Sequence, residues 1–441
     1  KKNGVRLNFE SANFNIFLTN LYPLSTNYAQ ISTKIPWTPL LLTMLTQAAA
    51  TMAAYTLSTA SPHIAPDLGV ENEDVAQLVA IVYGVGAISA LFAPPLVHRF
   101  GGMAISLAIC TAAGAMQALA VLSDTILMLG LASVALGCCY GMTAPSSSHV
   151  LAKLAPAKRR NIIFSIRQIG VPMGGIMGGL LIPPLILLGG WRLAFSAQLV
   201  FVLMLALSIY MVRHRYDFDR DLHRRIFRPS GPARVINLLR ELPELRPLAL
   251  ASVIYSGIQL CFGAFLVTQI VRLHGQEAYH FASAIALVTF QLSGIVTRIV
   301  LGFAADAWIS ARTLLAAQGV LMGISAIIAA QYDTTWPLWL ILSNTALAGS
   351  TASGYTGLAF AEFARIGGPP RAAETTGLGA ALMFGGVAVM APLFRLGIDV
   401  FNGYAVPFLV IAALAFISAA VLILFREKPV VLSDPRPYQT D

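Results

Sequence analysis

Two arginines inside long apolar stretches are the residues of this sequence best suited to bind a ligand. Arg298 lies in "GIVTRIVLGFAADAWISAR" (294–312), and no Asp or Glu precedes it for twenty positions; Arg167 lies in "SIRQIGVPMGGIMGGLLIPPL" (165–185). A guanidinium stays charged at neutral pH, and its planar fork of N–H donors matches a carboxylate or another planar oxyanion. Because all twenty Asp and Glu residues fall in tails, loops or the last turn of an apolar run, fixed positive charge without fixed negative charge predicts an anion site.

The composition places these arginines in a membrane protein. The chain of 441 residues is 57% hydrophobic and 11% charged, with a mean hydropathy of +0.72, whereas soluble domains carry about 25% charged residues. The net charge of +9 does not indicate a nucleic-acid partner, because the basic residues fall in short loops between apolar runs. The four cysteines lie within these runs without C-x-x-C spacing, which is typical of small buried hydrophobic residues.

Apolar runs long enough to cross a bilayer give the organisation of the chain. A spanning helix needs about 20 apolar residues, and the sequence predicts twelve: 37–60, 76–97, 104–122, 126–150, 162–187, 193–212, 247–271, 281–304, 312–331, 336–361, 375–396 and 403–425. We therefore predict an all-α integral membrane protein of two six-helix bundles, 36–212 and 247–425, joined by a polar linker, 213–246. Tails occupy 1–35 and 426–441; the first lacks the features of a signal peptide.

The distribution of positive charge predicts the orientation in the membrane. The two tails and the loops on the side of the linker hold 24 of the 29 Lys and Arg residues, and the opposite loops hold only Arg192 and Arg272. Positive charge is retained on the cytoplasmic side. We therefore expect a multi-pass protein of the cell (inner) membrane with both termini and the linker in the cytoplasm.

Twelve spans in two sets of six, a basic central loop and two related loop motifs resemble the major facilitator superfamily. Its G-x-L-x-D-R-x-G-R-R motif between spans 2 and 3 is similar to "PPLVHRFGG" (94–102), where Arg99 and Gly101 match but His98 stands for the aspartate. The second copy, "GFAADAWISAR" (302–312), matches at Gly302 and Asp306 and lies 208 residues later, as a duplication of six-helix halves requires. The resemblance covers residues 36–425.

The resemblance implies a bundle with pseudo-two-fold symmetry and a central cavity, lined by spans 1, 4, 7 and 10, with spans 5 and 8 side by side between the halves. It then places on the cavity wall polar and aromatic residues that fall at helical spacing in these spans: Gln47 and Tyr55 in span 1, Tyr140 in span 4, Tyr255 and Gln259 in span 7, and Asn344 in span 10. Any one of them alone is better explained as contact between helices, and they gain weight because they lie in the four cavity spans.

The same resemblance implies how the arginines and the loop motifs act. Arg298, Gly302 and Asp306 follow R-x-x-x-G-x-x-x-D, similar to the superfamily's nitrate/nitrite porters, in which such an arginine holds the anion; their second arginine has no counterpart at Ala90. A small organic anion, such as a monocarboxylate, therefore fits better than nitrate. Arg298 is the leading candidate for substrate binding, with Arg167 second, and both have structural or interfacial alternatives.

The loop motifs imply a cytoplasmic gate that includes His98, Arg99, Gly302 and Asp306, in which Asp306 caps the N-terminus of span 5; Glu362 is a further gating candidate outside the motifs. The "GVPMGG" of span 5 is similar to the family's antiporter motif but carries an inserted residue, so close helix packing with a proline bend explains it better and antiport is not inferred.

The expected function is secondary active transport of a small organic anion by alternating access, coupled to a proton, to an exchanged anion or to neither. Efflux of hydrophobic or drug-like compounds is the alternative. A membrane enzyme or receptor fits less well, because the seven histidines are scattered and no segment is long enough for a signalling domain. The sequence predicts no metal and no cofactor, and as partners only the substrate, the coupled ion and the lipid bilayer; we expect a monomer.

Overall fold

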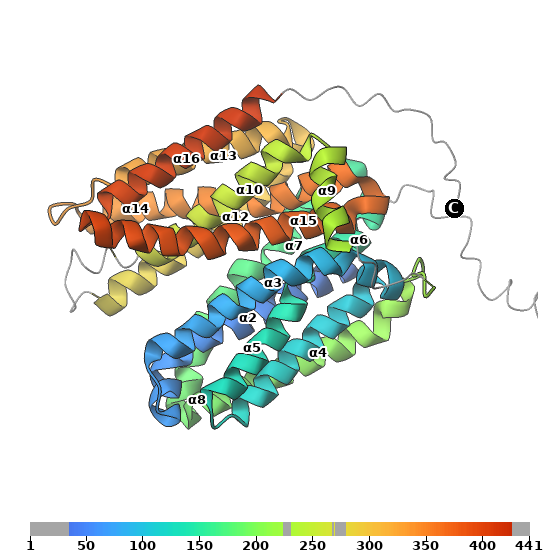
Figure 1. Cartoon of the computed structure of the whole chain (residues 1–441), viewed down its shortest axis with the longest axis horizontal. Coiled ribbons are helices and arrows are strands. Elements are labelled where there is room, and N and C mark those ends of the chain that lie inside the picture. The colour runs from blue at the N-terminus through green and yellow to red at the C-terminus, as the bar shows by residue number, and fades with distance from the viewer. Residues whose placement is uncertain (1–34, 224–230, 267–268, 270–278, 426–441) are drawn as a thin grey trace, which may run out of the picture.

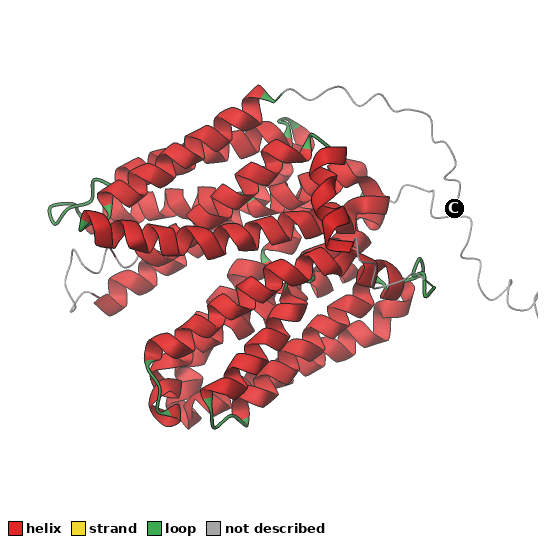
Figure 2. Ribbon diagram, viewed as in Figure 1, coloured by secondary structure: helices red, strands yellow, loops and turns green. Residues whose placement is uncertain are grey.

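The computed structural model describes residues 35–223, 231–266, 269 and 279–425. The described residues form helices joined by short loops, without a strand (Figure 2). The first half contains α2 (Trp37–Leu68), α3 (Asn72–Phe100), α4 (Gly102–Val121), α5 (Ile126–Tyr140), α6 (Thr143–Leu154), η1 (Ala157–Arg159), α7 (Arg160–Gln168), α8 (Gly170–Val212) and η2 (Arg213–Arg215). After α9 (Gly231–Glu241), the second half contains α10 (Leu245–Cys261), η3 (Phe262–Leu266), α12 (Tyr279–Ala307), α13 (Ala311–Ala329), α14 (Leu338–Ala348), η4 (Gly349–Ser353), α15 (Thr356–Phe401) and α16 (Ala405–Leu424).

Ten helical segments among the described residues are long and apolar enough to cross a membrane. Two of them, Ala157–Arg215 and Leu338–Phe401, contain 59 and 64 residues, about three times the length that one crossing needs. Non-helical dihedral angles at Gly189 and Gly190 break the first, and Gly368, at φ 63°, breaks the second. With each of these two counted as a pair, the segments agree with the twelve spans that the sequence predicts.

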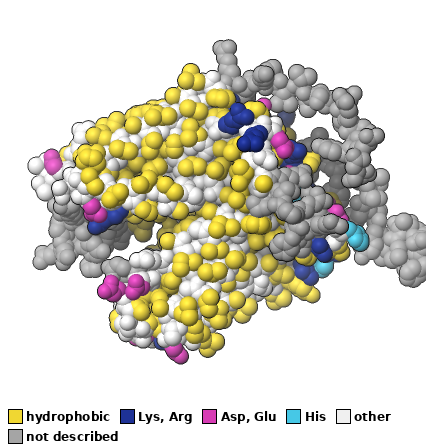
Figure 3. All heavy atoms as spheres, in the orientation of Figure 1, with side chains coloured by type: hydrophobic (Ala, Val, Ile, Leu, Met, Phe, Trp, Pro, Cys, Tyr) yellow, Lys and Arg dark blue, Asp and Glu magenta, His cyan; other side chains and the backbone are white. Residues whose placement is uncertain are grey.

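The two halves pack around separate hydrophobic cores, one made almost entirely of residues between 49 and 209 and the other mainly of residues between 235 and 422. We call them the N-half and the C-half. In Figure 1 they lie against each other where α6, α7 and α9 are found and diverge toward the opposite end. We call these the linker end and the far end. Figure 3 shows a notch between the halves at the far end, on the left of the view, and an apolar surface over most of the described residues.

Small residues lie at the helix crossings between the two halves. α15 packs along α3 and α6, and α12 packs along α7. At these crossings, Gly302 and Gly357 both lie against Ser165, and Gly377 lies against Ala90. Within the N-half, added Cβ atoms at Gly170 and Gly174 would collide with the backbone of α2, so the glycines of "GVPMGG" serve close helix packing.

Candidate functional site

Arg298 lies within α12 and is fully buried, and its hydrogen bonds among the described residues go to oxygen atoms of neighbouring helices. Its Nε donates to Ser353 O at 2.9 Å, its Nη2 to Ser353 Oγ at 3.0 Å, and its Nη1 to Gln168 O at 2.9 Å. Ser353 is the last residue of the π-helical segment η4, in the same half, whereas Gln168 ends α7 of the N-half. Arg298 therefore joins the two halves.

The sequence explains why the carbonyl of Gln168 is free to accept this bond. In a helix, this oxygen would accept from the N–H four residues later, but that residue is Pro172, which has no N–H. The next residue continues the ladder, because Met173 N donates to Ile169 O at 3.0 Å. Arg298 thus supplies the donor that the proline removes.

Arg167 lies one residue before Gln168 and is also almost fully buried, with 3% of its surface exposed. Its Nη1 donates to Gln168 Oε1, and its Nη2 donates to Thr143 O at 2.6 Å. Its Nε is buried without a hydrogen-bond partner. Gln168 therefore accepts from both arginines, from Arg167 through its side chain and from Arg298 through its backbone.

The two guanidinium groups lack a carboxylate partner among the described residues, whose hydrogen bonds and ion pairs connect Arg167 and Arg298 only to amide, carbonyl and hydroxyl oxygens. Neutral oxygens satisfy N–H donors but do not neutralise charge, and buried charge without a counter-ion is costly. The structure thus brings together the two arginines that the sequence singled out, through a residue, Gln168, that the sequence analysis did not include.

Aromatic and polar side chains of the N-half lie close to Arg167, and one ring comes from the C-half. Tyr140 contacts Thr51, with 3.1 Å between the two oxygens, and Gln47 Nε2 donates to Thr51 Oγ1 at 3.2 Å. Phe384 of α15 stacks on Tyr140 at a centroid distance of 5.4 Å and meets Tyr83 of α3 edge-on at 5.6 Å. These rings form a layer across the contact of the halves. Sequence reasoning missed Tyr83 and Phe384, because spans 2 and 11 are not among the cavity spans that the resemblance gives.

Two predicted wall residues make hydrogen bonds to α13 within the C-half in this conformation. Tyr255 is buried within the C-half, where its hydroxyl donates to Leu315 O of α13 at 3.3 Å. Asn344 binds Ser325 of α13 through both ends of its amide, at 2.9 and 3.1 Å. Helical spacing identified a polar face correctly, but it does not give the direction in which that face is turned. Tyr55 and Gln259 are half-buried.

Asp306 caps the N-terminus of α7, as the second loop motif predicts. Its Oδ1 accepts from Asn161 N at 3.0 Å and from Asn161 Nδ2 at 2.9 Å, and its Oδ2 accepts from Ile162 N at 2.9 Å. Gly302 lies between Asp306 and Arg298, and a Cβ there would approach Ser165 Oγ to 2.7 Å. α12 thus contacts the start, the middle and the end of α7.

The first motif copy does not make an equivalent cap with His98. The ring of His98 meets that of His149 edge-on at 4.9 Å, and His149 lies 3.2 Å from Asp219 of the linker, which also pairs with Lys153. Arg99 lies over the ring of Phe100 at 5.6 Å. The linker supplies a cap instead.

Asp217, which the sequence analysis did not single out, caps the N-terminus of α4. It accepts from Met103 N and Ala104 N, both at 2.8 Å. Burial raises the pKa of the Asp217 carboxyl, and its two backbone hydrogen bonds oppose that shift. The fit is close, because Gly101, at φ 98°, has no room for a Cβ beside Asp217.

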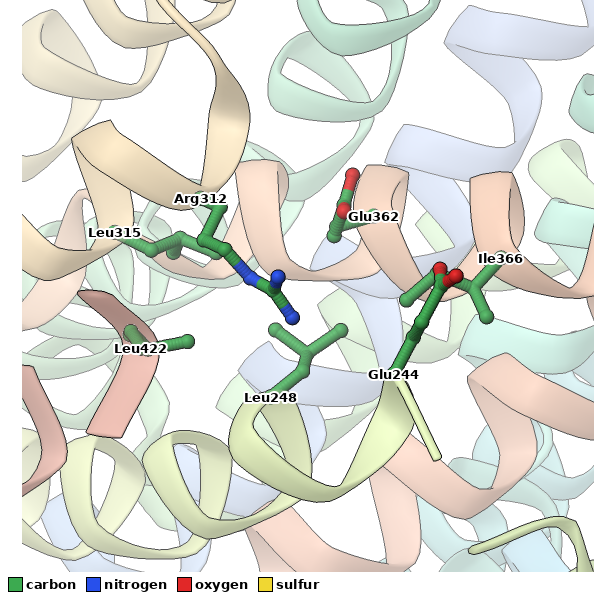
Figure 4. Close-up of a pocket in the computed structure, with 7 residues that line it drawn as sticks. All are labelled: Glu244, Leu248, Arg312, Leu315, Glu362, Ile366 and Leu422. Carbon is green, nitrogen blue, oxygen red and sulfur yellow. The ribbon is translucent and has the colours of Figure 1, made fainter. Parts of the chain in front are cut away.

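Glu362 lies at the linker end of the C-half and pairs with Arg365, whose Nε and Nη2 lie 2.8 and 2.7 Å from its carboxylate. It also lines a pocket with Glu244 and Arg312, whose guanidinium projects from α13 into the space between the two acids (Figure 4). The charge of Arg160, at the start of α7, interacts with those of Glu362 and Asp306. Glu362 therefore belongs to a charged group at the contact of the halves.

Comparison with known proteins agrees with this architecture. The family model of the Major Facilitator Superfamily matches residues 43–343. No curated protein matches by sequence.

Solved structures with the same fold include the transporter FucP in the outward conformation (TM-score 0.67, 15% identity, 87% of this chain and 98% of that one). The human organic anion transporter MFSD10 is similar at TM-score 0.65 and 15% identity, covering 88% and 100%. The proton:xylose symporter XylE bound to 6-bromo-6-deoxy-D-glucose follows at TM-score 0.63 and 12% identity, covering 88% and 95%. At these identities the likeness shows the fold alone.

Proposed function

Because this chain belongs to the major facilitator superfamily of transporters, we propose that it moves a small organic anion of the monocarboxylate class across the membrane by alternating access. The observation that carries the proposal is the pair of buried guanidinium groups that share Gln168, without a carboxylate partner among the described residues. An anion bound there supplies the missing counter-charge.

The contacts favour Arg167 over Arg298 as the primary anion ligand, which reverses the order that the sequence suggested. Each of the three nitrogens of Arg298 already donates to a protein oxygen. Arg167 has a free Nε, and its Nη1 is bonded to the side chain of Gln168, which a rotation can withdraw. A carboxylate in place of that amide would accept charge-assisted bonds, each contributing about 1.5–3 kcal/mol.

The surroundings suit an anion with a small apolar body. Phe384 of the C-half stacks on Tyr140, and Tyr83 meets both rings edge-on. The charge of Arg167 interacts with Tyr140, while Thr51 and Gln47 offer hydroxyl and amide groups beside Tyr140. A monocarboxylate would place its charge against Arg167 and its body against the rings. Phe384 is the member of the layer that leaves with the C-half when the halves separate.

The setting that we propose is the cell (inner) membrane, with the linker end and both termini in the cytoplasm and a monomer as the working unit. The excess of basic residues at the linker end supports this orientation. The halves make contact at the linker end, so this conformation would face outward. The coupling has three candidate forms: exchange for a second anion, facilitated diffusion, or a proton carried on the substrate's own carboxyl group.

The test is uptake into proteoliposomes of labelled acetate, lactate, benzoate and succinate, with and without a pH gradient. We expect saturable uptake of at least one monocarboxylate, inhibited by other carboxylates and not by quaternary amines of similar size. Competition by the amines would overturn the anion assignment. Transport confined to uncharged hydrophobic compounds would instead support efflux of such compounds by the same fold.

A further inference from the structure

We infer that the R-x-x-x-G-x-x-x-D run of α12 is a single clamp on α7, and that Arg298 is the part of this clamp which an anion releases. The release step rests on the proposed function; the clamp itself does not. Asp306 satisfies two N–H groups at the start of α7, and Arg298 satisfies a carbonyl at its end.

The lengths match. α7 has nine residues, Arg160–Gln168, and at about 1.5 Å per residue its first and last residues lie about 12 Å apart. Arg298 and Asp306 are eight residues apart in α12, which gives the same separation of about 12 Å. Gly302 stands midway and allows the two helices to touch at Ser165. The spacing of the motif thus matches the length of the helix that it holds.

The charges of Asp306 and Arg298 are also opposite to the partial charges at the ends of α7. The N-terminus of a helix carries partial positive charge and its C-terminus partial negative charge, and α12 presents Asp306 to the first and Arg298 to the second. Both contacts satisfy backbone groups that α7 cannot satisfy itself, the N–H groups because they begin a helix and Gln168 O because Pro172 lacks an N–H. Both contacts join the two halves, one at the arginine pair and the other between this pair and the linker end. Separation of the halves at the linker end therefore breaks both.

An anion bound between the arginines competes for the same donors. When a carboxylate takes Nη1 of Arg298, Gln168 O loses its donor, and the clamp is left with Asp306 alone. Occupation of the site therefore weakens the closed linker end, and the empty carrier stays closed there. Arg298 acts in this scheme as the link between anion binding and the gate.

The clamp can be tested without any ligand by double electron–electron resonance on the purified full chain, with its four cysteines replaced. Spin labels at Met211→Cys and Leu424→Cys, 73% and 78% exposed, report the linker end from the two halves. Labels at Leu187→Cys and Phe401→Cys, both exposed, report the far end. We expect Arg298→Gln to raise the ratio of the long to the short linker-end distance about tenfold, equivalent to about 1.4 kcal/mol, with a shorter far-end distance. An unchanged distribution would overturn the clamp.

Two further variants separate the cross-half bond from a general loss of stability. Arg395→Gln removes an exposed arginine of α15 that pairs with Asp399, four residues on, among the described residues, and it should leave both distributions unchanged. Pro172→Ala restores an N–H that can donate to Gln168 O, so it should raise the open fraction by itself. It should also reduce the further effect of Arg298→Gln to less than about threefold. Equal effects of Arg298→Gln in both backgrounds would show that Gln168 O is not the point of contact.

Pro172→Ala also keeps the test decisive if the Arg298→Gln protein does not insert into the membrane. It weakens the bond between Arg298 and Gln168 O without replacing the arginine. If the labels report the expected opening but no carboxylate stabilises the parent, the clamp stands and the proposed substrate class fails. If carboxylates bind but Pro172→Ala and Arg298→Gln leave the distances unchanged, the clamp fails and the substrate class stands.

Discussion

At the scale of single residues, the two buried arginines differ in what they still offer to a ligand. Arg298 is committed to Ser353 and Gln168 through three nitrogens, whereas Arg167 keeps an unbonded Nε and holds an amide oxygen that can move away. The first is therefore mainly a contact between helices in this conformation, and the second is the residue that we propose as the anion ligand. This difference depends on Pro172 and Ser353, which lie far from Arg298 in the sequence.

Removing the charge of Arg167 should weaken anion binding strongly while leaving the fold intact. We expect Arg167→Gln to lose at least about tenfold in affinity, because one charge-assisted hydrogen bond contributes about 1.5–3 kcal/mol. The measurement is the rise in unfolding temperature that the transported carboxylate gives to the purified protein. Arg395→Gln, at an exposed arginine, is the matched control and should respond as the parent does. A full response of Arg167→Gln would show that Arg167 does not contact the substrate.

Gln168→Glu should fill the site with an anion from the chain itself. The new carboxylate would replace an amide that already bonds Arg167, and it would neutralise buried charge that has no carboxylate partner among the described contacts. We expect a higher unfolding temperature without substrate, by about 1 °C for each kcal/mol gained, together with loss of the substrate-induced rise. Gln168→Leu removes the amide and adds no charge, so it should not mimic the substrate. Retained carboxylate binding by Gln168→Glu would contradict the placement of the site.

At the scale of helices, the sequence predicts which segments form helices, and where they lie in the chain, better than it predicts how each helix is rotated about its axis. The spans, the linker and the cap at Asp306 follow from apolar runs and a loop motif, because length and spacing are properties of a single helix. Tyr255 and Asn344 were assigned to the cavity because they lie on polar faces of spans 7 and 10, but these faces are turned toward α13. Rotation about the helix axis depends on all the neighbours at once, and no spacing within one helix records it.

The loss of a helix cap that joins the two halves should change the transport rate. The loss of a cap that does not join them should change only the free energy of unfolding. Asp306 of the C-half caps α7 of the N-half, so its cap joins the two halves. Asp217 lies in the linker just after α8 and η2 and caps α4, so its cap joins the linker to the N-half. A carboxylate at such a place contributes about 0.3–1 kcal/mol, and up to ~2 when partly buried. We expect Asp306→Asn to slow uptake by about threefold to tenfold with nearly unchanged affinity.

Asp217→Asn is the control for this comparison, since it loses the same kind of cap. It should lower the unfolding temperature and leave the uptake rate of the folded fraction unchanged. Uptake rates are compared per folded protein, by size-exclusion chromatography of the same preparation. Equal slowing by the two variants would mean that the Asp306 cap acts on stability alone.

At the scale of the whole molecule, each half is built around a hydrophobic core that lies mainly within that half. The N-half is tied at its far end by Arg192, which donates to Val121 O and Ser123 O and pairs with Asp67 of α2. The contacts between the halves include the cap at Asp306, the bond from Arg298 to Gln168 O, glycines against Ser165 and one layer of rings. Alternating access requires such contacts to separate while each half keeps its own core.

The charge distribution also predicts which end of this molecule faces the cytoplasm. The described far end carries Asp67, Asp124 and Asp333 near its surface and one loop arginine, Arg192, whereas the linker end carries Lys158, Arg159 and Arg215. Retention of basic loops during insertion places the linker end inside. In the chain without its own cysteines, a membrane-impermeant maleimide applied to intact cells should label Asp333→Cys and should label Arg159→Cys only after lysis. Both positions are exposed, so a difference between them reports sidedness rather than burial. Labelling of Arg159→Cys from outside would invert the orientation, and the conformation with its linker end closed would then face the cytoplasm.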